Sequence, residues 1–106
     1  MKGFQLTFYT QQDRMHDRQP LAQWLLAEAR RLGMRGATLS GAIQGVAHDH
    51  QVHTVNLFDL SEQPVQVTLV VSPDEAERLL AHLSKEQVIL FYTKAPVEFG
   101  TTGVSP

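Results

Sequence analysis

The sequence predicts an α+β fold in which an antiparallel sheet carries two helices on one face. Three observations support this prediction. Apolar and polar residues alternate near the N-terminus, and two later segments repeat apolar residues at helical spacing. The segments also follow one another in the order strand, helix, strand, strand, helix, strand. That order is the ferredoxin-like βαββαβ arrangement, and residues 1–106 provide enough chain for a single such domain.

The first two elements are an amphipathic strand and an amphipathic helix. Phe4, Leu6 and Phe8 alternate with more polar residues, which predicts a strand with one buried face. Pro20 suits the first turn of a helix, and Gly33 suits its C-terminal cap. Between them, apolar residues recur at helical spacing: Leu21, Trp24, Leu25, Ala29 and Leu32. We therefore expect the first helix to end at Gly33 and to bury this stripe, Trp24 included.

The middle of the chain is rich in strand-like segments. GATLSGAIQGV, residues 36–46, predicts the second strand, in which Gly41 and Ala42 indicate a bulge or the close approach of another backbone. TVNLFDL and VQVTLVV, residues 54–60 and 65–71, are also strand-like. The residues between them, 61–64, form either a turn or a bend in one long strand.

The second helix has the clearest start in the sequence. Ser72 to Glu75 form a capping box with proline at the first helical position, and four apolar residues follow at helical spacing. VILFY, residues 88–92, predicts a buried final strand, with Phe91 and Tyr92 in the core. The tail from residue 93 is expected to add an edge segment or to lie on a neighbouring subunit.

A sheet with helices on one face leaves its other face uncovered. Residues such as Gln5, Thr7 and Tyr9, or those that alternate with them, then face water or another subunit. Self-association through the open face is therefore expected.

Composition excludes several classes of function. The net charge of −2 and the pI of about 6.2 provide no basic field for nucleic acid or an anionic membrane. The apolar runs are too short to span a membrane, and the N-terminus lacks the pattern of a signal peptide, so we expect a cytoplasmic protein. The absence of cysteine excludes disulfides and thiolate chemistry.

The sequence does not favour an enzyme. It contains no Gly-x-Ser-x-Gly, His-Glu-x-x-His or Walker-type motif. The segment 13–18 holds Asp13, Arg14, His16, Asp17 and Arg18, which could provide an acid, a base and anion contacts. Charged loops before helices are more often simply solvated, so no catalytic residue is assigned.

Longer strings carry a resemblance to a known family. GMRGATLSGAIQGVAHDHQVH is similar to the second strand and loop base of the nitrogen regulatory PII proteins. From Gly3 to about Gly100, including HTVNLFDLSEQPV and FYTKAPVEFG, the chain more closely resembles the PII-like proteins of the uncharacterised domain-of-unknown-function family one hundred and ninety. The resemblance implies a regulatory homotrimer whose open sheet faces meet around a three-fold axis. It also implies clefts between subunits that hold an adenine nucleotide, and a long loop that contacts a membrane transporter or an enzyme.

The resemblance carries over to a few residues. Thr38 matches the threonine at the start of the PII second strand, and Gly45 matches the first glycine of the turn at the loop base. Val46 and Ala47 depart from that turn, and the glycine-rich loop with its lysine is shortened to the segment 84–87. Lys85 can partly replace the missing lysine, so Thr38, Gly45 and Lys85 are the predicted nucleotide contacts. A surface role for Lys85 and a packing role for Gly45 are the alternatives.

Three histidines lie close together in the predicted loop. His48 and His50 would project to one side of an extended segment, as a metal pair requires, whereas His53 abuts the next strand. The alternative is a solvated loop that binds a partner, since three or four convergent ligands are not evident. The resemblance implies that a small molecule in the cleft between subunits orders residues Val46 to His53, and that the ordered loop then selects a partner. A divalent-metal-binding protein and a ligand-free adaptor are the competing readings.

Overall fold

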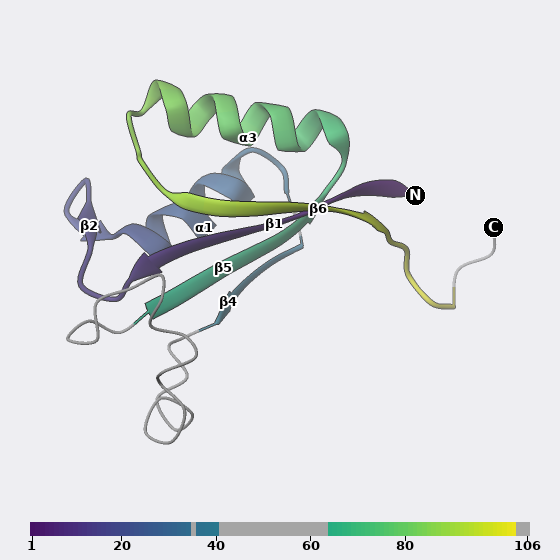
Figure 1. The fold of residues 1–106 in the computed structure, drawn as a ribbon, viewed down its shortest axis with the longest axis horizontal. Helices are drawn as coiled ribbons and strands as arrows, with labels where there is room; N and C mark the ends of the chain where they lie inside the picture. The colour runs from purple at the N-terminus through teal and green to yellow at the C-terminus, as the bar shows by residue number, and fades with distance from the viewer. Residues whose placement is uncertain (35, 41–63, 104–106) are drawn as a thin grey trace, which may run out of the picture.

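The computed structural model describes residues 1–34, 36–40 and 64–103. Within those ranges, a four-stranded antiparallel sheet has the order β4-β5-β1-β6, and both helices cover the same face of it (Figure 1). The strands of this sheet are β1 Lys2–Gln11, β4 Ala37–Ser40, β5 Pro64–Val71 and β6 Phe91–Glu98. The helices are α1 Leu21–Arg31 and α3 Pro73–Lys85, and β2 Met15–His16 pairs with β3 Gln19–Pro20 in a short hairpin. This topology confirms the predicted ferredoxin-like fold.

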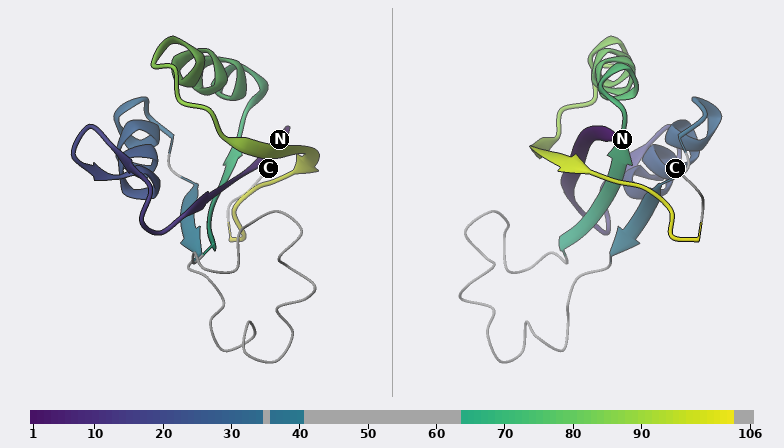
Figure 2. Two further views of the ribbon diagram at one scale, coloured as in Figure 1. Left: turned by 60° about the vertical axis from the view of Figure 1, so that its left-hand side comes forward. Right: turned by 90° about the vertical axis from the view of Figure 1, so that its right-hand side faces the viewer.

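The central strand β1 shows the predicted alternation. Leu6 and Phe8 are buried beneath the helices, and their partners on β5 are the buried Leu69 and Val67. Turned side views show the opposite face of the sheet free of both helices (Figure 2). The alternate residues of β1, such as Thr7, lie on that open face. The prediction of one covered and one open face is therefore confirmed.

The two helices begin and end close to the predicted residues. α1 starts at Leu21, one residue after Pro20, and Gly33 takes a φ of +88°, which suits a glycine that follows a helix C-terminus. Trp24 is buried with Leu21, Leu25 and Ala29, whereas Leu32 at the end of the apolar stripe is only partly buried. At the start of α3, the Ser72 hydroxyl accepts from the Glu75 amide at 3.2 Å, and the Glu75 carboxylate accepts from the Ser72 amide at 2.9 Å. The predicted capping box is therefore confirmed.

The prediction for the final strand is wrong in its bounds. Residues 88–90 lie outside β6, which runs from Phe91 to Glu98 through the segment predicted as a tail. Phe91 and Tyr92 are 55% and 41% exposed, so they do not belong to the core as predicted. The physical reason is that, among the strands that the structure describes, β6 pairs only with β1 and forms one edge of the sheet. Of the two alternatives left open for the tail, residues 93–98 form the edge segment.

Several predictions fall outside the described ranges. These are the bulge at Gly41 and Ala42, the strand 54–60 and the turn 61–63. Pro64 itself begins β5 and pairs with Gln11. In the parts of the chain that are described, no helix is long and apolar enough to cross a membrane.

Candidate functional site

The open face of the sheet carries a row of threonines. Thr38, Thr68, Thr7 and Thr93 are consecutive partners across β4, β5, β1 and β6, so one threonine comes from each strand. The hydroxyls of Thr7 and Thr68 lie 3.4 Å apart. Thr7 is buried at the centre of the row, whereas Thr38 and Thr93 are exposed at its ends. The row therefore presents hydroxyl groups from one edge of the sheet to the other.

An aromatic pair lies beside this row on the same face. The rings of Tyr9 and Phe91 are 5.5 Å apart between centroids, and these residues are register partners on β1 and β6. Phe91 keeps more than half of its surface exposed although it is apolar. Hydroxyls next to an exposed ring can contact a second protein chain or a flat ligand.

The structure places the two described nucleotide candidates on different sides of the sheet. Thr38 is exposed on the open face of β4, and Lys85 is the exposed last residue of α3 in the helix layer. The sheet separates them, because α3 packs on the face opposite Thr38. One chain alone therefore does not combine Thr38 and Lys85 into one site, and a second chain is needed to bring two such residues together.

The remaining predicted site residues lie outside the described ranges. They are Gly45, His48 and His50, together with the segment Val46 to His53. Their assigned roles stay predictions. Among the residues that the structure describes, no group of three or more His, Cys, Asp or Glu side chains is placed to hold a metal ion.

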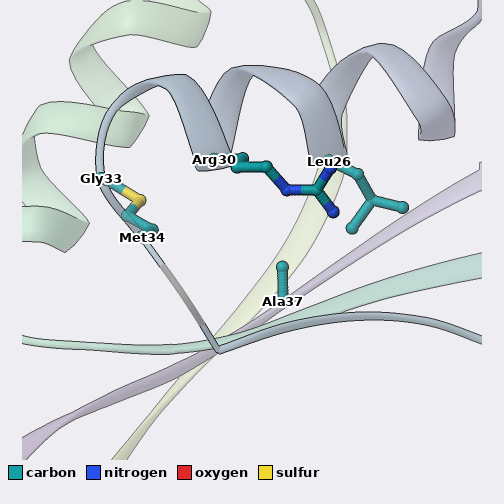
Figure 3. Close-up of a pocket in the computed structure, with 5 residues that line it drawn as sticks. All are labelled: Leu26, Arg30, Gly33, Met34 and Ala37. Atoms are coloured by element: carbon teal, nitrogen blue, oxygen red, sulfur yellow. The ribbon is translucent and has the colours of Figure 1, made fainter.

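A hollow of about 420 Å³ lies on the helix side of β4, next to the second half of α1 (Figure 3). Leu26, Met34 and Ala37 supply apolar walls, and the Arg30 side chain extends along the hollow. The hollow thus offers one guanidinium beside an apolar surface, a combination that suits a small anion with an apolar body. The hollow was not predicted from the sequence, where the only signal for it is the i, i+4 spacing of Leu26 and Arg30 on one helix.

A second group of polar side chains joins the two helices. The Glu28 carboxylate accepts from Arg31 at 2.9 and 3.1 Å, and it lies 2.7 Å from Nε2 of His82 on α3. Hydrogen bonds from Arg31 are the main cause that lowers the pKa of Glu28 to about 2; burial opposes this shift, and His82 adds to it. Glu28 in turn raises the pKa of Arg31. Glu28 is therefore ionised at neutral pH and can only accept, so Nε2 of His82 carries the hydrogen.

Trp24 extends this group towards the hairpin. Its ring lies 4.2 Å from the ring of His16 and 6.2 Å from that of His82, between centroids. Nε2 of His16 also lies 4.0 Å from the Glu86 carboxylate. His82 was not singled out from the sequence, because its partner Glu28 is 54 residues away in the chain. The only local signal was the spacing of Trp24 and Glu28, which places them on one face of α1.

Comparison with known proteins identifies related chains. The family model of DUF190, described as "Uncharacterized ACR, COG1993", matches residues 3–98. A UPF0166 protein of Aquifex aeolicus is 29% identical over 79 residues, which cover 74% of this chain and 75% of that protein.

Solved structures share the fold. A protein of Thermus thermophilus described as a PII-like signalling protein aligns with a TM-score of 0.59 at 21% identity, over 91% of this chain and 87% of the other. CPII of Thiomonas intermedia, solved bound to ADP, AMP and acetate, aligns with a TM-score of 0.52 at 16% identity, over 92% and 90%. At these identities the likeness concerns the fold.

Proposed function

This chain belongs to the DUF190 family, and from that premise we propose that it is a PII-like regulatory protein that binds an effector and a partner without catalytic turnover. The observation that carries the proposal is the open sheet face, where Thr38 stands at the exposed end of a row of threonines. The helices leave this face uncovered in a single chain. The fold shared with PII-like proteins supports a signalling or regulatory role.

The proposed assembly is a cytoplasmic homotrimer whose open faces meet around a three-fold axis. Two features support it: the exposed aromatic ring of Phe91 beside the threonine row, and the placement of Thr38 and Lys85 on opposite sides of the sheet. A neighbouring chain would cover the ring. In a cleft between two chains, Thr38 of one chain could also lie next to Lys85 of the other, which the sheet prevents within a single chain.

The proposed effector is an adenine nucleotide. CPII, which shares the fold, was solved with ADP and AMP. In this chain the Thr38 hydroxyl can accept or donate a hydrogen bond, the Lys85 ammonium can balance phosphate charge, and Gly45 can let backbone N–H groups approach a phosphate. We further propose that the bound effector fixes residues 46–53, which then contact a membrane transporter or an enzyme.

Calorimetry and thermal unfolding with AMP, ADP and ATP test this proposal. A ligand that binds only the folded protein adds about 2.7 kcal/mol of stability at a hundred times its dissociation constant. Thr38→Ala and Lys85→Ala should each weaken binding by about tenfold, the usual loss for a polar contact to a charged ligand. Thr101→Ala and Lys2→Ala replace exposed residues of the same types elsewhere and should leave affinity unchanged. Unfolding midpoints that do not move with any of the three nucleotides would overturn the assignment of the effector.

A further inference from the structure

The hollow between α1 and β4 is built around a turn that hydrogen bonds hold in place (Figure 3). After α1, the Gly33 amide donates to the Arg30 carbonyl and the Met34 amide donates to the Ala29 carbonyl, both at 2.9 Å. These two bonds form a Schellman motif, and Gly33 takes the left-handed conformation that the motif favours. The turn buries Met34, which is 3% exposed. The backbone at this end of the hollow is therefore fixed.

A small side chain on β4 keeps the hollow open. Ala37 is the register partner of the buried Leu69, so its methyl group faces the helix layer. Leu26 and Arg30 lie one turn apart on the side of α1 that looks towards Ala37. The space that these residues bound measures about 420 Å³, and small-molecule sites range from about 300 to 1,000 Å³. A larger side chain at position 37 would fill it.

The charge in the hollow comes from Arg30. Among the residues that the structure describes, no carboxylate pairs with Arg30, and no acidic side chain lines the hollow. The neighbouring Arg31 differs, because its guanidinium is bonded to Glu28 at 2.9 Å. Arg78 of α3 adds a further guanidinium at this end of α1, where it donates to the Leu32 carbonyl at 3.4 Å. The surroundings are therefore positively charged, and the N–H groups of Arg30 are available to a ligand.

A single guanidinium beside apolar walls favours a carboxylate as the ligand. The planar guanidinium donates two parallel hydrogen bonds to a carboxylate, and it is less strongly hydrated than an ammonium group, so it can pair next to an apolar surface. A purely apolar molecule would leave the guanidinium without an acceptor. A phosphate with two charges would meet one cation in the described lining and would keep a charge unpaired. The apolar walls in turn suit a carbon chain, and the flexible side chain of Met34 can adapt to its shape.

We propose that this hollow binds a small organic carboxylate with an apolar body. The carboxylate pairs with the guanidinium of Arg30, and the carbon chain lies against Leu26, Met34 and Ala37. The site is separate from the proposed nucleotide site, because Ala37 and Thr38 are neighbours on β4 and therefore face opposite sides of the sheet. A failure of either proposal leaves the other standing.

An NMR titration of the backbone amides with sodium hexanoate tests this site, with sodium chloride added to keep the ionic strength constant. The amide signals of Gly33, Met34 and Ala37 should move along one saturable curve. Hexanamide keeps the carbon chain and lacks the charge, whereas acetate keeps the charge and lacks the chain. Each should bind at least about tenfold more weakly than hexanoate. Signals that move without saturation, or equal affinities for hexanoate and hexanamide, would overturn the proposal.

Two variants separate the charge from the space. Arg30→Gln should weaken hexanoate binding by about tenfold, and Arg18→Gln, at an exposed arginine of the β2–β3 hairpin, should leave it unchanged. Ala37→Leu fills the hollow but keeps Arg30, and it should weaken binding by a similar factor while the amide spectrum stays that of a folded protein. Wild-type affinity in Arg30→Gln would overturn the proposal, whatever the outcome for Ala37→Leu.

Discussion

At the scale of single residues, Glu28 explains how the two helices are joined. Its carboxylate accepts from Arg31 on α1 and from His82 on α3, so one side chain serves both helices. The side chain of Glu28 is 16% exposed, and its ionised form depends on these donors. Removing the charge leaves the partners with a weaker acceptor in a partly buried place.

The lowered pKa of Glu28 predicts that the stability of the fold depends on pH in the acidic range. Its pKa is lowered from 4.5 to about 2 in the folded protein, mainly by Arg31. A lowered pKa means that the stabilisation is complete above the unfolded value near 4.5 and is lost as the pH falls towards 2. Glu28→Gln should therefore be less stable than the wild type by about 1 kcal/mol at pH 7, and the difference should shrink below pH 4.

Urea unfolding at pH 7, 4 and 2.5 measures this difference. Glu77→Gln is the matched control, because Glu77 is an exposed glutamate on α3. A constant gap between Glu28→Gln and the wild type at all three pH values would show that the ionised carboxylate does not stabilise the fold.

At the scale of the elements, the sequence predicted those features that depend on residues close together in the chain. The alternation at Leu6 and Phe8 predicted the buried face of β1, and the Ser72 motif predicted the start of α3. The prediction for the final strand was wrong because it placed Phe91 and Tyr92 in the core on hydrophobicity alone. Whether an apolar strand is central or at an edge depends on its pairing partners, and these are distant in sequence.

The capping box yields a prediction for α3. Ser72→Ala removes the acceptor for the Glu75 amide and should destabilise the protein by about 1 kcal/mol. Chemical unfolding at neutral pH measures the effect. Ser84→Ala, at an exposed position near the other end of the helix, should change stability by less than about 0.5 kcal/mol. Similar losses for both variants would mean that the cap is not what stabilises this helix.

At the scale of the whole molecule, only part of the candidate site could be predicted from the sequence. Thr38 was predicted and lies at the exposed end of the threonine row, yet Lys85 lies on the other side of the sheet. The periodicity of a strand tells which residues share its face, and it does not tell how separate chains meet. It also does not tell which elements of one chain pack together, so His82 was missed, because its partners Glu28 and Trp24 lie on α1.

The open face predicts the effect of a new charge on assembly. Thr93 is exposed at the β6 end of the threonine row, so Thr93→Lys places an ammonium group within the proposed interface. Light scattering should show the loss of a species with three times the 11.9 kDa mass of one chain, while circular dichroism stays unchanged. Thr101→Lys should still assemble, because Thr101 lies beyond β6. A fully assembled Thr93→Lys variant would argue against this face as the interface.

Native mass spectrometry of the wild type with added AMP or ADP tests the proposed nucleotide-binding trimer, because one spectrum reports both the number of chains and the number of bound nucleotides. We expect a three-chain species that gains the mass of up to three nucleotides, and Thr38→Ala or Lys85→Ala should lower that occupancy without changing the number of chains. A single-chain species, or a trimer that gains no nucleotide mass, would contradict it.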